Sequence, residues 1–197
     1  NVSYIETMFT SIPCDNVKNI DTSFNTQLLY AGLTRNETVA MALLEQLYRQ
    51  VMDKNGKACA AAFNKFVADM HSRYKIDDES FTMRYQNYVV RVVPPADVFK
   101  SLVIAFESAN TSPLIVGVNI VAPEDNEVSM RDYWLHMLMF KFCHSKYPDV
   151  KYAMHAGELA LGLVKPEELT WHIDAAVRIA GANRIGHGVD MPYETKS

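Results

Sequence analysis

The sequence predicts an α/β domain with parallel strands, and three observations lead to this prediction. Strand-like and helix-like segments alternate from residue 81 onward, which is typical of parallel strands joined by right-handed crossovers. The segments 114–121 and 150–154 are nearly all apolar, as strands covered on both faces must be. Polar residues gather directly after these segments, where a parallel sheet presents its functional edge.

Length and composition set the broad class. The 197 residues form one expected domain, residues 1–197, and 49% are apolar, which is enough to bury a core. The net charge of −4 argues against nucleic acid or an anionic membrane as a partner. The cysteines Cys14, Cys59 and Cys143 are widely spaced, so we expect free thiols and no disulfide framework.

The first part of the chain is expected to be a mostly helical, insertion-like segment, residues 7–80. Residues 2–6 predict a short strand, and residues 7–36, rich in Ser, Thr, Asn and Asp, predict an irregular excursion. A helix then follows from Thr38, and Asn55-Gly56 separates it from a second one. The apolar residues at helical spacing in the first helix are Ala40, Leu43, Leu44, Leu47 and Val51. A lid, a dimer contact or simple packing all remain open as the role of this segment.

The central part begins with a β-branched and aromatic strand at residues 85–93. Pro94-Pro95 opens a helix, and the apolar strand 114–121 follows it. Ser129 and Asp132 have the spacing of a capping box at the start of the next helix, which ends before Pro148.

The last part begins with the strand 150–154, which leads into a turn at His155 and is expected to be followed by a helix. Pro166 starts a helix that Gly181 closes. The expected buried face of this helix is Leu169, Ile173, Ala176, Val177 and Ala180. Residues 184–188 form one more strand end.

The polar clusters after the strands decide between two α/β architectures. They occupy residues 123–125, residues 155–158 and His187. A TIM barrel collects functional groups at the C-terminal ends of its strands, whereas an open sheet usually has one Gly-rich phosphate turn, and no G-x-G-x-x-G occurs here. The sequence therefore favours a TIM-type (β/α)8 barrel over an open sheet.

Three of the polar residues are candidates for chemistry. His155 carries an imidazole suited to zinc, although a lone histidine after a strand is more often structural. Glu158 could equally be a helix cap or a salt-bridge member. His187 lies between Gly186 and Gly188, which allow a ligand to approach the backbone closely. The remaining histidines, expected to be structural, are His71, His136, His144 and His172.

Two motifs resemble a known family. His155-Ala156-Gly157-Glu158, followed by Arg184-Ile185-Gly186-His187-Gly188, is similar to the adenosine deaminase family of metal-dependent aminohydrolases. Residues 113–125 resemble the strand and loop that precede the histidine motif, and residues 129–133 are most similar to the adenosine deaminase growth factor branch. The resemblance covers about residues 81–190, and the order and spacing of the paired motifs are highly specific.

The resemblance implies a zinc enzyme that hydrolyses adenosine to inosine and ammonia. His155 would be a ligand of a single Zn²⁺, which activates a water molecule. Glu158 would protonate the purine ring, and His187 would orient the water and stabilise the developing oxyanion. Ala122, where the family commonly has a glycine, and Gly157 would contact the purine nucleoside.

The sequence also departs from the family pattern. It contains no H-x-H for two further zinc ligands, and no late Asp-Asp pair. Asn119 stands where an aspartate is usual. The resemblance therefore implies the central part of a longer enzyme, that is, part of a TIM-type (β/α)8 barrel with about five of its eight strands present. We expect the isolated 197 residues to be inactive, and the open barrel to be covered by a second copy or by further chain. Deamination of another 6-aminopurine, or a non-catalytic binding protein, remains an alternative, and the compartment (cytoplasmic, periplasmic or secreted) stays open.

Overall fold

The strands form a curved parallel arrangement in the computed structural model, which describes residues 2–11, 14, 17, 21 and 23–195. In this described part, three strands form one parallel sheet in the order β1-β2-β3, and two form a second, β4-β5. A single parallel bridge between Val118 and Tyr152 joins β3 to the segment that leads into β4. The strands are β1 (Tyr4–Thr10), β2 (Thr82–Val90), β3 (Ile115–Val121), β4 (Ala153–Ala156) and β5 (Arg184–His187).

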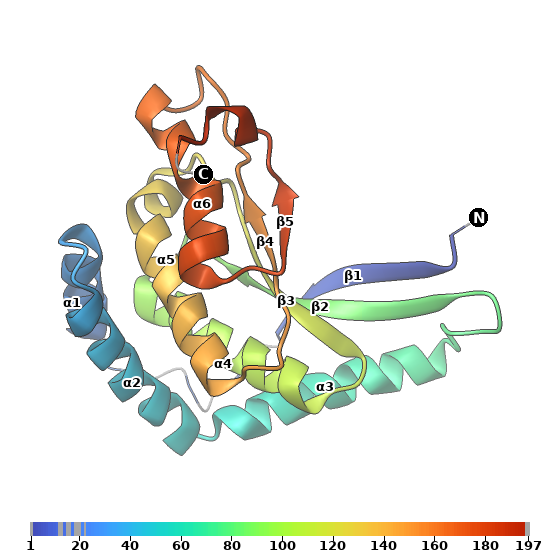
Figure 1. Ribbon diagram of the computed structural model, residues 1–197. Helices are drawn as coiled ribbons and strands as arrows, with labels where there is room; N and C mark the ends of the chain where they lie inside the picture. Colours follow the sequence, from blue (N-terminus) through green and yellow to red (C-terminus); the bar gives the residue numbers. More distant parts are fainter. Residues whose placement is uncertain (1, 12–13, 15–16, 18–20, 22, 196–197) are drawn as a thin grey trace.

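The helices connect these strands and cover one side of them (Figure 1). The long helix α3 runs beside β1 and β2, while α4 and α5 lie against the middle of the sheet. The helices are α1 (Ser23–Leu33), α2 (Glu37–Asp53), α3 (Gly56–Arg73), α4 (Pro95–Thr111), α5 (Glu127–Lys146) and α6 (His172–Ala175), with 3₁₀ helices η2 (Pro166–Thr170) and η4 (Met191–Tyr193) and a π-helical turn η3 (Ala176–Ala180). Among the described residues, none of the helices combines the length and the apolar character that a membrane-spanning helix requires.

An ion pair between the first and the last strand shows how strongly the strands curve. Arg184 of β5 pairs with Glu6 of β1. In a flat sheet four strand spacings would separate these strands by roughly 19 Å, which is farther than the two side chains reach together. The strands therefore curl around a concave face, and Figure 1 shows β1 and β2 turned away from the direction of β4 and β5.

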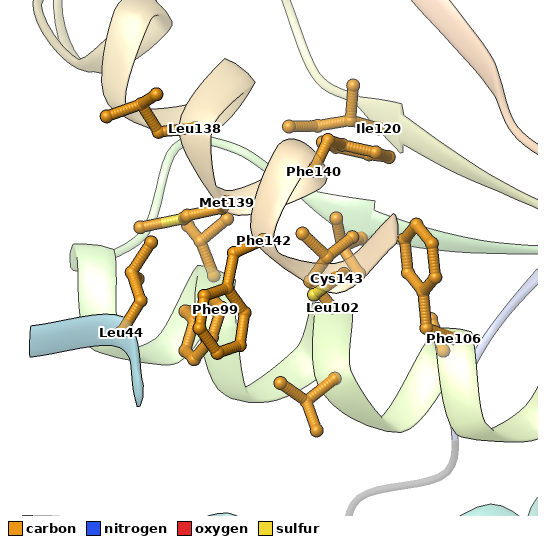
Figure 2. Packing of buried hydrophobic residues seen from close by; sticks show 14 of the residues in the cluster. Leu44, Phe99, Leu102, Phe106, Ile120, Leu138, Met139, Phe140, Phe142 and Cys143 are labelled. Carbon is orange, nitrogen blue, oxygen red and sulfur yellow. The ribbon is translucent and has the colours of Figure 1, made fainter. Parts of the chain in front are cut away.

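The main apolar core lies between the helices α4 and α5 and the convex face of the sheet (Figure 2). Phe142 of α5 packs edge to face on Phe99 of α4, with ring centroids 5.4 Å apart. Phe106 meets Phe140 in the same way at 5.9 Å, and Figure 2 places Phe140 beside Ile120 of β3. Such ring pairs add to the free energy gained by burial.

The structure corrects the prediction of an irregular excursion over residues 7–36. Residues 7–10 continue β1 and pair with β2 as far as Thr10 opposite Tyr88. Residues 23–33 form α1, which buries Phe24, Leu28 and Ala31. Their spacing of four and three residues is helical, although the many polar residues around them suggested a loop. The rest of the predicted excursion lies partly outside the described residues.

The predicted capping box at the start of α5 is also wrong. Asn126 caps this helix, and its side chain accepts a hydrogen bond from the amide of Val128 at 2.9 Å. Ser129 instead donates to the carbonyl of Pro123 at 2.8 Å, and Asp132 pairs with Arg131. Asparagine caps as well as serine does, so the earlier of two suitable residues begins the helix.

The structure also corrects the prediction for the segment after β4. His155 lies inside β4, and residues 157–165 are not helical. The expected helix from Pro166 is divided into η2, α6 and the π turn η3, and the π turn turns Val177 outward, where it is 48% exposed. Gly181 ends this region with a φ of +79°, as predicted.

Cys14 and Cys59 form a disulfide, with 5.8 Å between their Cα atoms. The prediction of three free thiols is therefore wrong for this pair and holds for the buried Cys143. The two cysteines are 45 residues apart in the sequence, and only the folding of α3 beside the segment after β1 brings them together. The prediction of a mixed α/β fold with parallel strands is confirmed, and the strands do not close into a barrel within the described residues.

Candidate functional site

A hollow of about 470 Å³ lies at the C-terminal ends of the strands. Its lining includes four of the site residues predicted from the sequence, namely Ala122, His155, Glu158 and His187. The other lining residues are Met8, Val121, Pro123, Asp125 and Leu163. Three strand ends and the segment after β4 thus bring the predicted catalytic and metal-binding side chains to one place.

The ring of His155 is held from one side by β3. Its Nδ1 atom lies 3.0 Å from the carbonyl oxygen of Ile120 and 3.0 Å from Oδ1 of Asn119. A backbone carbonyl only accepts hydrogen bonds, so Nδ1 carries the proton and Nε2 keeps its lone pair. Nε2 has no hydrogen-bond partner among the described residues. Burial lowers the pKa of His155, and the positive charge that His187 can carry adds to this effect.

Asn119 is in turn fixed by a chain of side chains across the concave face. Its Nδ2 donates to Oε1 of Gln86 at 3.0 Å, and Gln86 donates to Glu6 at 2.6 Å. Glu6 pairs with Arg184. Each of the five described strands therefore contributes one side chain to a hydrogen-bond network that runs from Arg184 to His155. This network fixes the orientation of the imidazole.

Glu158 and His187 face each other across the hollow. Nε2 of His187 lies 3.6 Å from Oε2 of Glu158, and the side chains are 33% and 48% exposed, respectively. The rings of His155 and His187 have centroids 5.0 Å apart. An acid, a second titratable group and an imidazole lone pair thus converge within the reach of one small molecule.

The backbone around the hollow is strained at two of its residues. Ala122 has a φ of +96° and His187 a φ of +72°, in the region that residues with a side chain rarely adopt. Such strain costs about 1–3 kcal/mol at each residue and gathers at functional sites. Ala122 follows β3 and His187 ends β5, and both residues line the hollow.

Gly157 lies beneath the hollow and does not line it. Its φ is +73°, and a Cβ atom there would collide with Oδ1 of Asp190. Its amide donates to Glu124 at 3.1 Å, and its carbonyl accepts from the amide of Val189 at 2.7 Å. Both backbone groups are therefore used inside the protein, and a substrate contact at Gly157 stays a prediction.

A buried polar cluster supports the turn from below. Glu124 and His172 are both fully enclosed, and Nδ1 of His172 lies 2.7 Å from Oε1 of Glu124. Burial acts to raise the pKa of Glu124, but the hydrogen bonds from His172 and from the amide of Glu158 hold it below its ordinary value. Glu124 is therefore a carboxylate at neutral pH.

Arg91 and Asp190 complete this cluster. Arg91 is buried and donates to the carbonyls of Ala122 at 2.8 Å and His155 at 2.9 Å. Asp190 is also buried, and burial together with the charge of Glu124 raises its pKa to about 6. The cluster thus links three segments beneath the hollow, those that follow β2, β3 and β5.

Sequence reasoning missed most of this cluster. Glu124 was noted only as one of several polar residues after a strand, His172 was taken as structural without a partner, and Arg91 was not singled out. A charged residue directly after a β-branched strand, as Arg91 is after β2, is the signal that could have found it.

The donor atoms at the hollow fit one ligand position for zinc. An imidazole with its Nδ1–H bound to a carbonyl and its Nε2 lone pair available is the usual form of a metal-binding histidine. Among the described residues, however, no group of three or more His, Cys, Asp or Glu could hold a metal ion. Since catalytic zinc takes three protein ligands or more, His155 could supply only part of such a site.

Comparison with protein-family models, with curated proteins and with solved structures found no match to this chain. The resemblance to the adenosine deaminase family therefore rests on the sequence motifs.

Proposed function

We propose that this chain supplies the general acid-base residues of a zinc-dependent aminohydrolase that deaminates adenosine. Its strands would be part of a (β/α) barrel. The observation that carries the proposal is the convergence of Glu158, His187 and the Nε2 atom of His155 on one hollow. The curvature measured by the pairing of Arg184 with Glu6 supports the barrel. A hollow of about 470 Å³ is in the range of small-molecule sites.

Each side chain has a distinct task in this proposal. Zinc, when bound with His155 as one ligand and with further ligands from outside residues 1–197, would supply Lewis-acid activation of water. Glu158 gives a proton to the ring nitrogen beside the attacked carbon, and His187, 3.6 Å from it, orients the incoming water. Ala122, with its backbone held at a positive φ, lies against the nucleoside. Water is consumed, and ammonia leaves with inosine as the product.

The test uses the protein that contains this chain, loaded with zinc and assayed for conversion of adenosine to inosine. Glu158→Gln should lower kcat by about 10³-fold, because proton transfer by a positioned side chain contributes this much, while the zinc content stays unchanged. Glu167→Gln is the matched control, since Glu167 is an exposed carboxylate of η2 away from the hollow. Equal turnover in the two variants would refute the role of Glu158.

A substrate panel separates the alternatives. Turnover of another 6-aminopurine in place of adenosine would change the assigned substrate but leave the proposed deamination chemistry in place. Nucleoside binding without turnover or stoichiometric zinc would favour a binding protein, an alternative supported by the incomplete set of metal donors in the described residues. The 197 residues alone should show no turnover at saturating zinc.

A further inference from the structure

The turn that carries Glu158 is held by a carboxylate with no contact to the hollow. The amides of Gly157 and Glu158 both donate to Glu124, at 3.1 and 2.8 Å, one to each carboxylate oxygen. Glu124 follows β3 and is 1% exposed. A residue of one strand end therefore sets the backbone path of the next one.

This arrangement requires both oxygen atoms of a carboxylate. Glu124 receives three hydrogen bonds, from the two amides and from Nδ1 of His172, and only an ionised carboxyl group accepts at both ends. A glutamine here would place its NH₂ group against an N–H donor. At least one buried donor would then lose its partner, and an unpaired buried donor destabilises the turn.

His172 is fixed independently of Glu124. Its ring stacks on Tyr133 with centroids 3.8 Å apart and packs edge to face on Trp171 at 4.4 Å. The hydroxyl of Tyr133 donates to the carbonyl of His172 at 2.9 Å. The imidazole therefore acts as a fixed donor that holds Glu124 in place.

The other side of the turn is closed by the chain after β5. The carbonyl of Gly157 accepts from the amide of Val189, and the carboxyl group of Asp190 lies where a side chain on Gly157 would be. The turn is thus confined on two sides. Only the amides of Gly157 and Glu158 depend on Glu124. A change at Glu124 therefore alters the direction in which the side chain of Glu158 points.

We propose that Glu124, held by His172, is a positioning residue that aims Glu158 into the hollow through the backbone amides of the turn. The proposal rests on the deaminase function proposed above for its kinetic consequence, and on the hydrogen bonds alone for its structural part. Glu124 touches no substrate in this proposal, and its effect passes entirely through residues 157 and 158.

The experiment compares Glu124→Gln with Glu107→Gln in the full-length, zinc-loaded protein. Glu107 is also a buried carboxylate, but it lies in α4 and accepts a hydrogen bond from the hydroxyl of Tyr147 at 2.9 Å, away from the hollow. We expect Glu124→Gln to lower kcat about 100-fold with KM and zinc content little changed, since displacement of a catalytic group by about 1 Å has this effect. Glu107→Gln should lose similar thermal stability and keep kcat.

Two variants of His172 test whether a conservative replacement preserves the hydrogen bond to Glu124. His172→Asn keeps an N–H donor close to the position of Nδ1 and should retain kcat within about threefold, whereas His172→Leu removes the donor and should resemble Glu124→Gln. Equal kcat in the two His172 variants, or a normal kcat in folded Glu124→Gln, would overturn the proposal.

Amide hydrogen exchange separates this proposal from the proposed function. In Glu124→Gln the amides of Gly157 and Glu158 should exchange at least about 10-fold faster, beyond any global change, and in Glu107→Gln they should not. Should the parent protein fail to deaminate any 6-aminopurine, the proposed function fails, while this exchange pattern still supports the positioning of the turn. Unchanged exchange at both amides would overturn the positioning whatever the activity.

Discussion

Glu107 and Glu124 are two buried carboxylates in opposite surroundings. Glu107 lies beside the apolar layer between α4 and α5 and accepts from one side-chain hydroxyl, that of Tyr147. Glu124 lies beneath the hollow and accepts from two backbone amides and an imidazole. The first group is a local feature of packed helices, whereas the second shapes the main chain of the candidate site. Burial alone therefore says little about what an acidic side chain does.

The same contrast holds for the regions around them. The region of α4 and α5 is filled by rings and aliphatic side chains in contact. Beneath the hollow, buried charged and titratable side chains gather instead, namely Arg91, Glu124, His172 and Asp190. We therefore expect changes in the first region to alter stability alone, and changes in the second to alter the site or its pH dependence.

The largest expected effect belongs to the apolar region. Phe106→Ala should lower the free energy of unfolding by about 3–5 kcal/mol, because Phe106 packs on the rings of Phe140, Tyr147 and Tyr152. Urea denaturation measures the change. Phe66→Ala is the control, since Phe66 is 49% exposed and should cost well under this amount. A similar loss in both variants would contradict the assignment of the core.

The disulfide should contribute an effect of almost the same size. Cys14→Ser opens a link between residues 45 apart, and the entropy of the unfolded chain then favours unfolding by about 4 kcal/mol. Thermal denaturation with and without a reducing agent measures this. The reductant should lower the Tm of the parent and leave that of the variant unchanged, and a parent insensitive to reduction would show that the link is absent.

Asp190→Asn should stabilise the protein at alkaline pH. The folded-state pKa of Asp190, about 6, lies above its ordinary value of 3.8. The folded protein therefore binds this proton more tightly, so the stabilisation is complete below pH 3.8 and is lost as the pH rises through 6. The uncharged variant should exceed the parent by about 3 kcal/mol at pH 8 and match it below pH 4.

Denaturation of both proteins at each pH gives this difference directly. Their comparison cancels the opposite contribution of His136, whose pKa burial lowers to about 4. A difference that does not change with pH would contradict the titration of Asp190 in this range.

The smallest effect concerns the backbone strain at the hollow. Ala122→Gly should raise the free energy of unfolding by about 1 kcal/mol, because glycine adopts a φ of +96° without a steric penalty. Ala153→Gly in β4 is the control and should destabilise by about 0.5–1 kcal/mol. Destabilisation of both variants to the same extent would show that Ala122 is not strained.

The elements predicted correctly are those with a repeating apolar pattern. The helix with Ala40, Leu44 and Val51 and the apolar strand before Ala122 are present because their patterns match the period of one regular structure. α1 was missed because polar residues surround Phe24 while the exposed apolar residues Tyr30 and Leu33 lie close to Ala31, so no single apolar face stands out in the sequence. The segment after β4 was missed because its conformation depends on the chain after β5 and on Glu124, and neither is close in sequence.

The candidate site shows the same division. His155, Glu158 and His187 were found because glycines and titratable groups after strands form a local pattern. Their convergence on one hollow is a property of the folded chain.

The sequence by itself determined the class of fold, the order of its strands and the side chains available for chemistry, because each depends on residues close along the chain. Only the tertiary structure decided that Cys14 meets Cys59, that the carbonyl of Ile120 fixes the proton on His155, and that Glu124 holds the turn of Gly157 and Glu158. Each of these contacts joins residues 33 or more positions apart. The curvature of the strands and the packing of the helices bring such partners together, and no local pattern specifies them.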